Sequence, residues 1–100
     1  MRMTYATAMV LQALDAGYRY GFEIIEVVGV RSGTVYPLLR RLEEAGVLRS
    51  RWEQVRVTRS SNRPARKYYE LTRRAAPLIA QARDRYPAPD LATASEQQHV

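Results

Sequence analysis

The sequence VRSGTVYPLLRRLEEAGVLRSR, from Val30 to Arg51, carries the strongest structural signal in the chain. Its apolar residues recur at the i, i+3, i+4 and i+7 spacing of one buried helical face: Val35, Leu38, Leu39 and Leu42. Ser32 is placed to cap the start of this helix, and Gly46 to end it, because glycine adopts positive φ without a steric penalty. The pattern predicts a helix from Ser32 to Ala45, followed at once by an extended segment.

A shorter helix is predicted just before it, from Tyr20 to Val28. Its apolar residues are assigned to one widened core-facing stripe: Phe22, Ile24, Ile25 and Val28. Gly29 ends this helix, and only two residues separate it from Ser32. Two short amphipathic helices joined by a tight glycine-containing turn form a helix-turn-helix, although many helical bundles contain the same pair.

The N-terminal residues predict a further helix, from Thr4 to Asp15, with Thr4 as its cap. Its apolar residues extend beyond one stripe: Tyr5, Ala6, Ala8, Met9, Val10, Leu11, Ala13 and Leu14. A helix that is apolar over so much of its circumference is covered on two sides. The second cover is either another subunit or the C-terminal helix of the same chain, and the sequence leaves both open.

The segment after the long helix predicts a basic β-ribbon. A strand runs from Val47 to about Val57, with a bulge near Glu53, and returns over 65–71 after a polar turn. Trp52 shares a face with Leu48 and is assigned to the core or to an interface. A ribbon directly after a helix-turn-helix is a wing. The predicted fold is therefore mainly α with a small antiparallel β-ribbon, a winged helix-turn-helix, plus a C-terminal helix.

The C-terminal helix is expected from Thr72, its cap, to about Tyr86, and Pro77, in or just beyond the first turn, allows the start to shift by a few residues. Its apolar side is predicted to consist of Ala76, Ile79 and Ala80. The remainder has two prolines and no periodicity and is expected to be disordered. These limits give a winged helix-turn-helix domain over 1–71, a C-terminal helix over 72–86 and a tail over 87–100.

Composition excludes several classes of function. The 100 residues contain no cysteine and only one histidine, His99, so a disulfide, a thiolate metal site and a histidine-based triad are all excluded. No cofactor or metal is expected, and no nucleophile–base pair is recognisable, so the chain is not expected to be an enzyme. No apolar run reaches the roughly 20 residues that span a bilayer. Gln12 and Asp15 interrupt the N-terminal apolar run, which favours a mature cytoplasmic protein over a secretory signal.

The positive charge is concentrated in one part of the chain. The whole chain has a net charge of +6, whereas residues 49–74 hold nine basic residues and two acidic ones, a net charge of +7. Such a segment is typical of a protein that binds a polyanion. The alternatives are a solvated surface without a partner and a surface that meets an acidic protein.

Three motifs lie in a fixed order along the chain: YRYGFEI at 18–24, SGTVYPLLRRLEEAGVLRSRWE at 32–53 and RPARKYYELT at 63–72. In these motifs the chain resembles the PadR family of winged helix-turn-helix transcriptional regulators. The resemblance implies a homodimer, joined by the C-terminal helix with help from the first, that binds a palindromic operator in double-stranded DNA and usually represses. Many members have a longer C-terminal helical region. Some bind aromatic effectors at the dimer interface, but nothing in this sequence identifies such a pocket, so a small-molecule effector stays unassigned.

The helix 32–45 is expected to lie in the major groove, with the wing on the backbone or in the minor groove. Small residues and the missing N–H of Pro37 leave its first turn open for a phosphate. The candidate DNA-binding residues are Tyr20, Ser32, Gly33, Thr34, Tyr36, Arg40, Arg41, Arg63, Arg66 and Lys67. Arg40 is the first candidate for a base edge, because arginine pairs with guanine O6 and N7, and its alternative is an ion pair with Glu44. Tyr20 resembles a backbone-contacting tyrosine but fits a core position equally well, and Arg41 is undecided.

Overall fold

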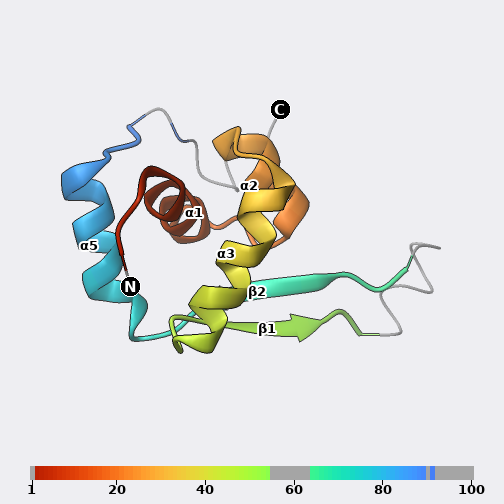
Figure 1. The fold of residues 1–100 in the computed structure, drawn as a ribbon. Coiled ribbons are helices and arrows are strands. Elements are labelled where there is room, and N and C mark those ends of the chain that lie inside the picture. The colour runs from red at the N-terminus through yellow and green to blue at the C-terminus, as the bar shows by residue number, and fades with distance from the viewer. Residues whose placement is uncertain (1, 55–63, 90, 92–100) are drawn as a thin grey trace.

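The fold is a body of helices from which a two-stranded ribbon projects (Figure 1). The structure is a computed structural model that describes residues 2–54, 64–89 and 91. Within these residues the elements run α1 (Tyr5–Asp15), α2 (Gly21–Val28), α3 (Ser32–Glu44), β1 (Leu48–Trp52), β2 (Lys67–Leu71) and α5 (Ala75–Arg85). The arrangement confirms the predicted mainly α fold, a winged helix-turn-helix followed by a C-terminal helix.

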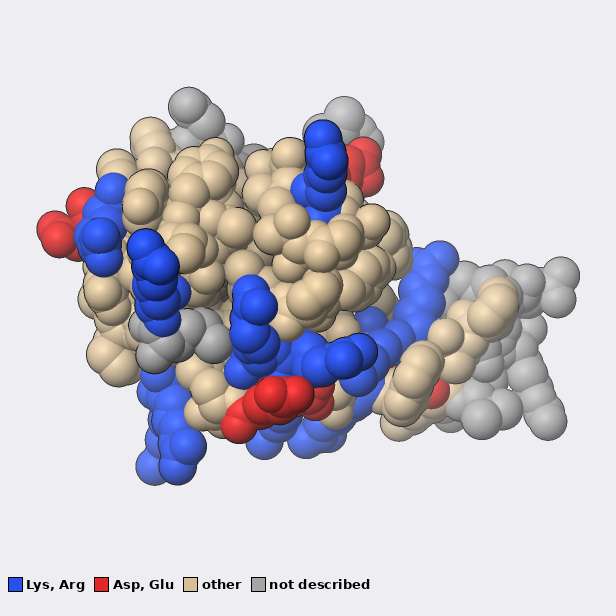
Figure 2. Space-filling view, in the orientation of Figure 1, with Lys and Arg blue, Asp and Glu red and all other residues tan. Residues whose placement is uncertain are grey.

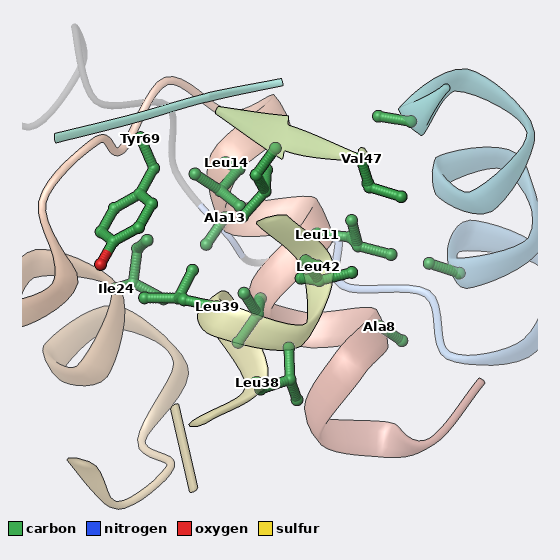
Figure 3. Packing of buried hydrophobic residues seen from close by; sticks show 14 of the residues in the cluster. Ala8, Leu11, Ala13, Leu14, Ile24, Leu38, Leu39, Leu42, Val47 and Tyr69 are labelled. Atoms are coloured by element: carbon green, nitrogen blue, oxygen red, sulfur yellow. The ribbon is translucent and has the colours of Figure 1, made fainter. Parts of the chain in front are cut away.

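The predicted stripe of the central helix forms the middle of the core (Figure 3). All four of its residues are buried: Val35, Leu38, Leu39 and Leu42. Burying each such side chain contributes about 1.5–3 kcal/mol. Tyr69 reaches from β2 towards Ile24 of α2, so the ribbon shares the same core. This shared core fixes the position of α3 relative to the ribbon.

The first helix is covered on two sides by its own chain. In Figure 1, α1 lies between α5 and the pair α2–α3, and it makes contacts with all three. The buried Gln12 links α1 to the end of α5, because its Nε2 donates to the carbonyl oxygen of Tyr86 at 2.7 Å. An ion pair between Arg83 and Asp15 joins the same two helices at the surface. The C-terminal helix is therefore the second cover that the sequence left open.

The buried face of α5 differs from the prediction. Ala75, Ile79 and Ala82 face the core, whereas Ala76 and Ala80 are exposed. The helix begins at Ala75, within the shift of a few residues that Pro77 allowed, and its N-cap is Arg74. The Thr72 side chain still caps the turn that leads into this helix, because its Oγ1 accepts from the N–H of Arg74 at 3.3 Å. Its hydroxyl donates to the carbonyl oxygens of the turn before β1, at 2.6 Å to Gly46 and 3.1 Å to Val47.

The helix caps are only partly as predicted. Thr4 caps α1 as expected, since its Oγ1 accepts from the N–H of Thr7 at 3.2 Å. Ser32 is not the cap of α3: Arg31 holds the extended N-cap conformation, and Ser32 is already the first helical residue. The Ser32 hydroxyl is therefore not used in capping. Gly29 and Gly46 end α2 and α3 with φ of 69° and 77°, the left-handed conformation that favours glycine.

Two aromatic residues predicted to be core or interface residues are exposed. On α2 the buried positions are Gly21, Ile24 and Val28, so Phe22 lies to the side of this stripe with 47% of its surface exposed. Trp52 does follow Leu48 on one face of β1, but it is 65% exposed. The reason is that the ribbon runs out beyond the helices at that end (Figure 1). An interface role for Trp52 stays a prediction.

The ribbon is attached to the helices at its base. β1 and β2 are antiparallel, with Leu48 opposite Leu71 and Trp52 opposite Lys67. The link between α1 and α2 forms an isolated β-bridge with β2: Tyr20 bridges Tyr68, and the N–H of Tyr69 donates to the Arg19 carbonyl at 2.8 Å. The predicted bulge and turn lie largely outside the described residues. So does most of the predicted tail, although Leu91 packs against the core.

No helix in the described part of the chain is long and apolar enough to span a membrane.

Candidate nucleic-acid interface

The first turn of α3 is open to solvent. Ser32, Gly33 and Thr34 are all exposed, and an added Cβ at Gly33 would meet no atom within 4 Å. The first intrahelical bonds run from the N–H groups of Thr34 and Val35 to the carbonyl oxygen of Arg31, each at 3.0 Å. The earlier N–H groups therefore point out of the helix start, where the helix dipole is positive. This end of α3 is suited to bind an anion.

Tyr36 stands on α3 directly over the start of α2. A Cβ added at Gly21 would lie 2.4 Å from Tyr36 Cε1 and 2.9 Å from its hydroxyl oxygen, so the ring occupies the space that a side chain would need. The ring is nevertheless 47% exposed. Its position thus depends on a glycine in the neighbouring helix, and its hydroxyl is held at the surface between α2 and α3.

A surface hollow of about 230 Å³ joins α2, α3 and the ribbon. Its lining consists of Tyr20, Gly21, Phe22, Tyr36, Trp52, Arg66, Lys67 and Tyr69. Four of the predicted DNA-binding residues, from three different elements or their flanks, therefore meet at one place. We call this site the aromatic hollow. It combines phenol hydroxyls and two cations with apolar rings, a combination that suits the charged and apolar parts of a sugar–phosphate backbone.

Arg66 is held in the aromatic hollow by rings and by its own backbone. Its guanidinium carbon lies 4.9 Å from the ring centroid of Phe22 and 5.7 Å from that of Tyr20, and these two rings stack with centroids 5.6 Å apart. Each cation–π contact of this kind contributes roughly 0.5–1 kcal/mol at an exposed site. Two hydrogen bonds of 2.9 Å join the Arg66 backbone to Glu53: the Arg66 N–H donates to the side-chain oxygen Oε1, and the Glu53 N–H donates to the Arg66 carbonyl. The cation is therefore positioned before any ligand arrives.

Lys67 has a different environment, because its ammonium faces a carboxylate. Its Nζ lies 3.8 Å from Oε1 of Glu43, and Ser50 Oγ donates to the other oxygen of the same carboxylate. Tyr69, on the strand that carries Lys67, is buried. Burial raises the pKa of the Tyr69 phenol, and the charge of Glu43 and, to a smaller extent, Tyr36 raise it further. The inner end of the aromatic hollow is therefore linked to the last turn of α3.

Arginines on α3 and on the outer face of β1 extend the positive surface. Arg40, Arg41, Arg49 and Arg51 are exposed, and Figure 2 shows Lys and Arg gathered around the ribbon and the end of α3, with a small acidic group among them. Arg49 pairs across the ribbon with Glu70 at 3.2 Å. Within the described residues Arg40 has no ion pair with Glu44, so its predicted alternative is not formed. The predicted contact at Arg63 lies outside the described residues.

Three residues in or beside the candidate interface were not among the DNA-binding residues predicted from the sequence. Phe22 was placed in the core, but the 3- and 4-residue steps from Gly21 to Ile24 and Val28 already mark a different buried stripe. Trp52 lies on the same face of β1 as Leu48, as predicted, and it is exposed because this end of the ribbon extends beyond the helices. Glu43 carries no local signal for its role, since its contacts with Ser50 and Lys67 come from tertiary structure.

The described residues contain no group of three or more His, Cys, Asp or Glu side chains that could hold a metal ion. The interface therefore has to be explained from its cations, hydroxyls, rings and helix terminus.

A helix-turn-helix, a wing and a basic surface shared by both define a DNA-binding winged-helix regulator. Comparison of the sequence with known families identifies the family within this class. It matches the model of the Transcriptional regulator PadR-like family over residues 10–76, and the chain belongs to this family. The proteins of this family are transcriptional regulators and not enzymes. No match was found among curated proteins.

Solved structures show the same fold. A PadR family transcription regulator from Clostridium difficile R20291 is 25% identical, with a TM-score of 0.69 over 83% of this chain and 88% of that chain. A transcriptional regulator from Clostridium thermocellum is 23% identical, with a TM-score of 0.67 over 82% and 80% of the two chains. Lactococcus lactis ZitR, solved in complex with DNA, is 19% identical, with a TM-score of 0.64 over 99% of this chain and 60% of ZitR.

Proposed function

We propose that this protein is a homodimeric transcriptional repressor that binds a palindromic operator in double-stranded DNA. The observation that carries the proposal is the aromatic hollow, where residues from α2, α3 and the ribbon meet beside the exposed start of α3. A recognition helix and a wing that share one surface can contact adjacent parts of a duplex. The fold likeness to ZitR, which was solved with DNA, supports the same reading.

In this proposal α3 lies in the major groove. Its first turn, from Ser32 to Thr34, binds a phosphate through backbone N–H groups and hydroxyls. Arg40 reaches a base edge, since its guanidinium is exposed and not paired with Glu44 within the described residues. Arg41, exposed beside it, contacts the backbone on the same side of the helix.

The aromatic hollow receives the DNA backbone. Tyr20 and Tyr36 offer hydroxyls to a phosphate, and Arg66 adds a cation whose position is already fixed. Phe22 and Trp52 supply apolar surface for the sugars. Such contacts orient the protein on the duplex without reading its sequence. Lys67 is a separate case, because its ammonium is paired with Glu43. Arg63 remains a predicted contact of the wing.

Dimerisation is proposed through α1 and α5. Tyr5 is 55% exposed and meets Tyr86 edge to face, with ring centroids 5.9 Å apart. Met9 and Leu78 are only partly buried beside them. A second copy would cover this apolar surface and supply the second recognition helix that a palindrome requires. Light scattering at micromolar concentration tests this step, and a monomer mass would contradict it.

The deciding experiment is binding to labelled duplexes across a salt series. A DNA-binding regulator gives a logarithm of the binding constant that falls with log salt by about 0.9 per neutralised phosphate. Footprinting on the DNA upstream of its own gene then locates the operator. Absent or salt-insensitive binding to every duplex, that upstream DNA included, would refute the proposal.

Two variants separate the roles within the interface. Arg40→Ala should weaken binding to the footprinted site more than binding to random duplex, because it removes a base contact. Arg66→Ala should weaken both alike, because it removes a backbone contact. Equal losses for both variants on both duplexes would show that the roles are assigned wrongly.

A further inference from the structure

One carboxylate joins the recognition helix to both strands of the wing. Glu43 lies in the last turn of α3, accepts a hydrogen bond from Ser50 Oγ on β1, and lies 3.8 Å from Lys67 Nζ on β2. The buried Tyr69 phenol on β2 lies near the same carboxylate: burial raises its pKa, and the charge of Glu43 raises it further.

The Glu43–Lys67 pair lies where a phosphate contact is expected. Lys67 lines the aromatic hollow together with Arg66 and Tyr36, and its side chain is 39% exposed. The Glu43 side chain is 34% exposed, so water and ions reach the pair from one side. Lys67 thus faces two alternative anions, the carboxylate of its own chain and a phosphate of the DNA.

We propose that Glu43 is a specificity-determining residue that withholds Lys67 from the DNA backbone. The inference rests on the DNA-binding function proposed above. A lysine–phosphate contact strengthens binding to every sequence equally, because it releases counterions and reads no base. Occupying Lys67 with Glu43 therefore lowers affinity for random DNA while leaving the base contacts of α3 in place. The ratio of specific to non-specific affinity depends on this difference.

The neighbouring residues offer matched controls. Glu43→Gln removes the charge that holds Lys67, while the amide oxygen can still accept the hydrogen bond from Ser50. Glu44→Gln removes the same charge one residue further on, where the side chain is exposed and unpaired within the described residues. Ser50→Ala removes the hydrogen bond to Glu43 without changing any charge.

The experiment measures binding of the full chain to a fluorescein-labelled random-sequence duplex at several salt concentrations. Glu43→Gln should make the salt slope steeper by about 0.9 per bound chain and raise affinity at 0.1 M salt by roughly eightfold, the effect of one added phosphate contact. Lys67→Gln should change the wild-type slope little and should abolish the gain when combined with Glu43→Gln. Glu44→Gln and Ser50→Ala should leave the slope as it is.

Distinct results would overturn the inference. An unchanged slope in Glu43→Gln, or an equal increase in Glu44→Gln, would show that Glu43 does not withhold a phosphate contact. Loss of one full phosphate from the slope in Lys67→Gln alone would show that Lys67 already contacts DNA, and this measurement does not require a change at Glu43. Both results leave the DNA-binding function standing. If the wild-type chain bound no duplex, the proposed function and this inference would both be wrong.

A structural readout checks the contact without DNA. In protein labelled with ¹³Cζ-tyrosine, Glu43→Gln should lower the pKa of Tyr69, because the charge that helps to raise it is gone. Glu44→Gln should leave that pKa where it is, and an equal shift in the two variants would contradict the placement of Glu43.

Discussion

Substituting alanine for Gly21 should weaken DNA binding without unfolding the protein. The new Cβ would lie 2.4 Å from Tyr36 Cε1 and 2.9 Å from the Tyr36 hydroxyl oxygen. Carbon atoms pack at about 3.5–4.0 Å, so the ring has to move by roughly 1 Å or more. Because it is 47% exposed, the ring can swing towards solvent, but its hydroxyl then leaves the aromatic hollow.

The expected change in stability is small because two effects oppose each other. A displaced ring costs about 0.5–1.5 kcal/mol if it leaves its preferred rotamer. Alanine restricts the unfolded chain more than glycine does, which stabilises a helical position by about 0.4–1 kcal/mol. The loss in binding is larger. A hydrogen bond from a hydroxyl to a charged phosphate contributes about 1.5–3 kcal/mol, which corresponds to roughly 10- to 150-fold in the dissociation constant per bound chain.

Fluorescence anisotropy with a labelled duplex measures the loss, and thermal unfolding confirms that the fold is retained. The reasoning is tested most sharply in a Tyr36→Phe background, where no hydroxyl is left to displace. There Gly21→Ala should cause little further loss. Two losses that simply add, or wild-type affinity in Gly21→Ala, would refute the idea that Gly21 positions the Tyr36 hydroxyl.

Three further predictions concern stability. Leu39→Ala should lower the free energy of unfolding in urea by about 2–5 kcal/mol, since Leu39 is fully buried, and a loss below about 1 kcal/mol would contradict its place in the core. Thr72→Val should cost about 1 kcal/mol in the same assay, because the hydroxyl bonds to Gly46 and Val47 are lost, whereas Thr72→Ser should retain most of the stability. The raised pKa of Tyr69 predicts that its contribution to the free energy of unfolding is constant below about pH 10, the usual phenol pKa, and is lost above it as the unfolded chain ionises first. Between pH 9 and 11, about one unit either side of that pKa, the free energy of unfolding in urea should fall less steeply in Tyr69→Phe than in the wild type. An unchanged pH profile would argue against burial as the cause of the raised pKa.

The sequence predicted those parts of the fold that depend on local pattern. The stripe from Val35 to Leu42, the cap at Thr4 and the glycine end at Gly46 all follow from spacing and backbone preference, and all are confirmed. The start of α5 at Ala75 lies within the shift of a few residues that Pro77 allowed, and Thr72 both accepts from the N–H of Arg74 and donates its hydroxyl to the turn before β1. Residue type predicts the first of these two bonds, whereas the second depends on tertiary structure.

The candidate interface was predictable in its charge but not in its assembly. Basic residues at Arg66 and Lys67 look equivalent in the sequence, yet one lies against the rings of Phe22 and Tyr20 and the other against a carboxylate. These partners come from α2 and α3, which lie more than 20 residues away along the chain. The exposure of Trp52, assigned to the core or to an interface, likewise depends on how far the ribbon extends beyond the helices, whereas that of Phe22 follows from the spacing of the buried residues on α2.

The β-bridge between the α1–α2 link and β2 has a consequence for how the wing responds to local opening. The N–H of Tyr69 donates to the carbonyl oxygen of Arg19, so the base of the ribbon is hydrogen-bonded to the link that leads into α2. A two-stranded hairpin alone is only marginally stable in water. With this bond and the buried Tyr69 ring, the base of the wing and the helix-turn-helix form one cooperative unit. In native-state hydrogen exchange the Tyr69 amide should therefore exchange only when the core opens, at the rate of amides inside α3.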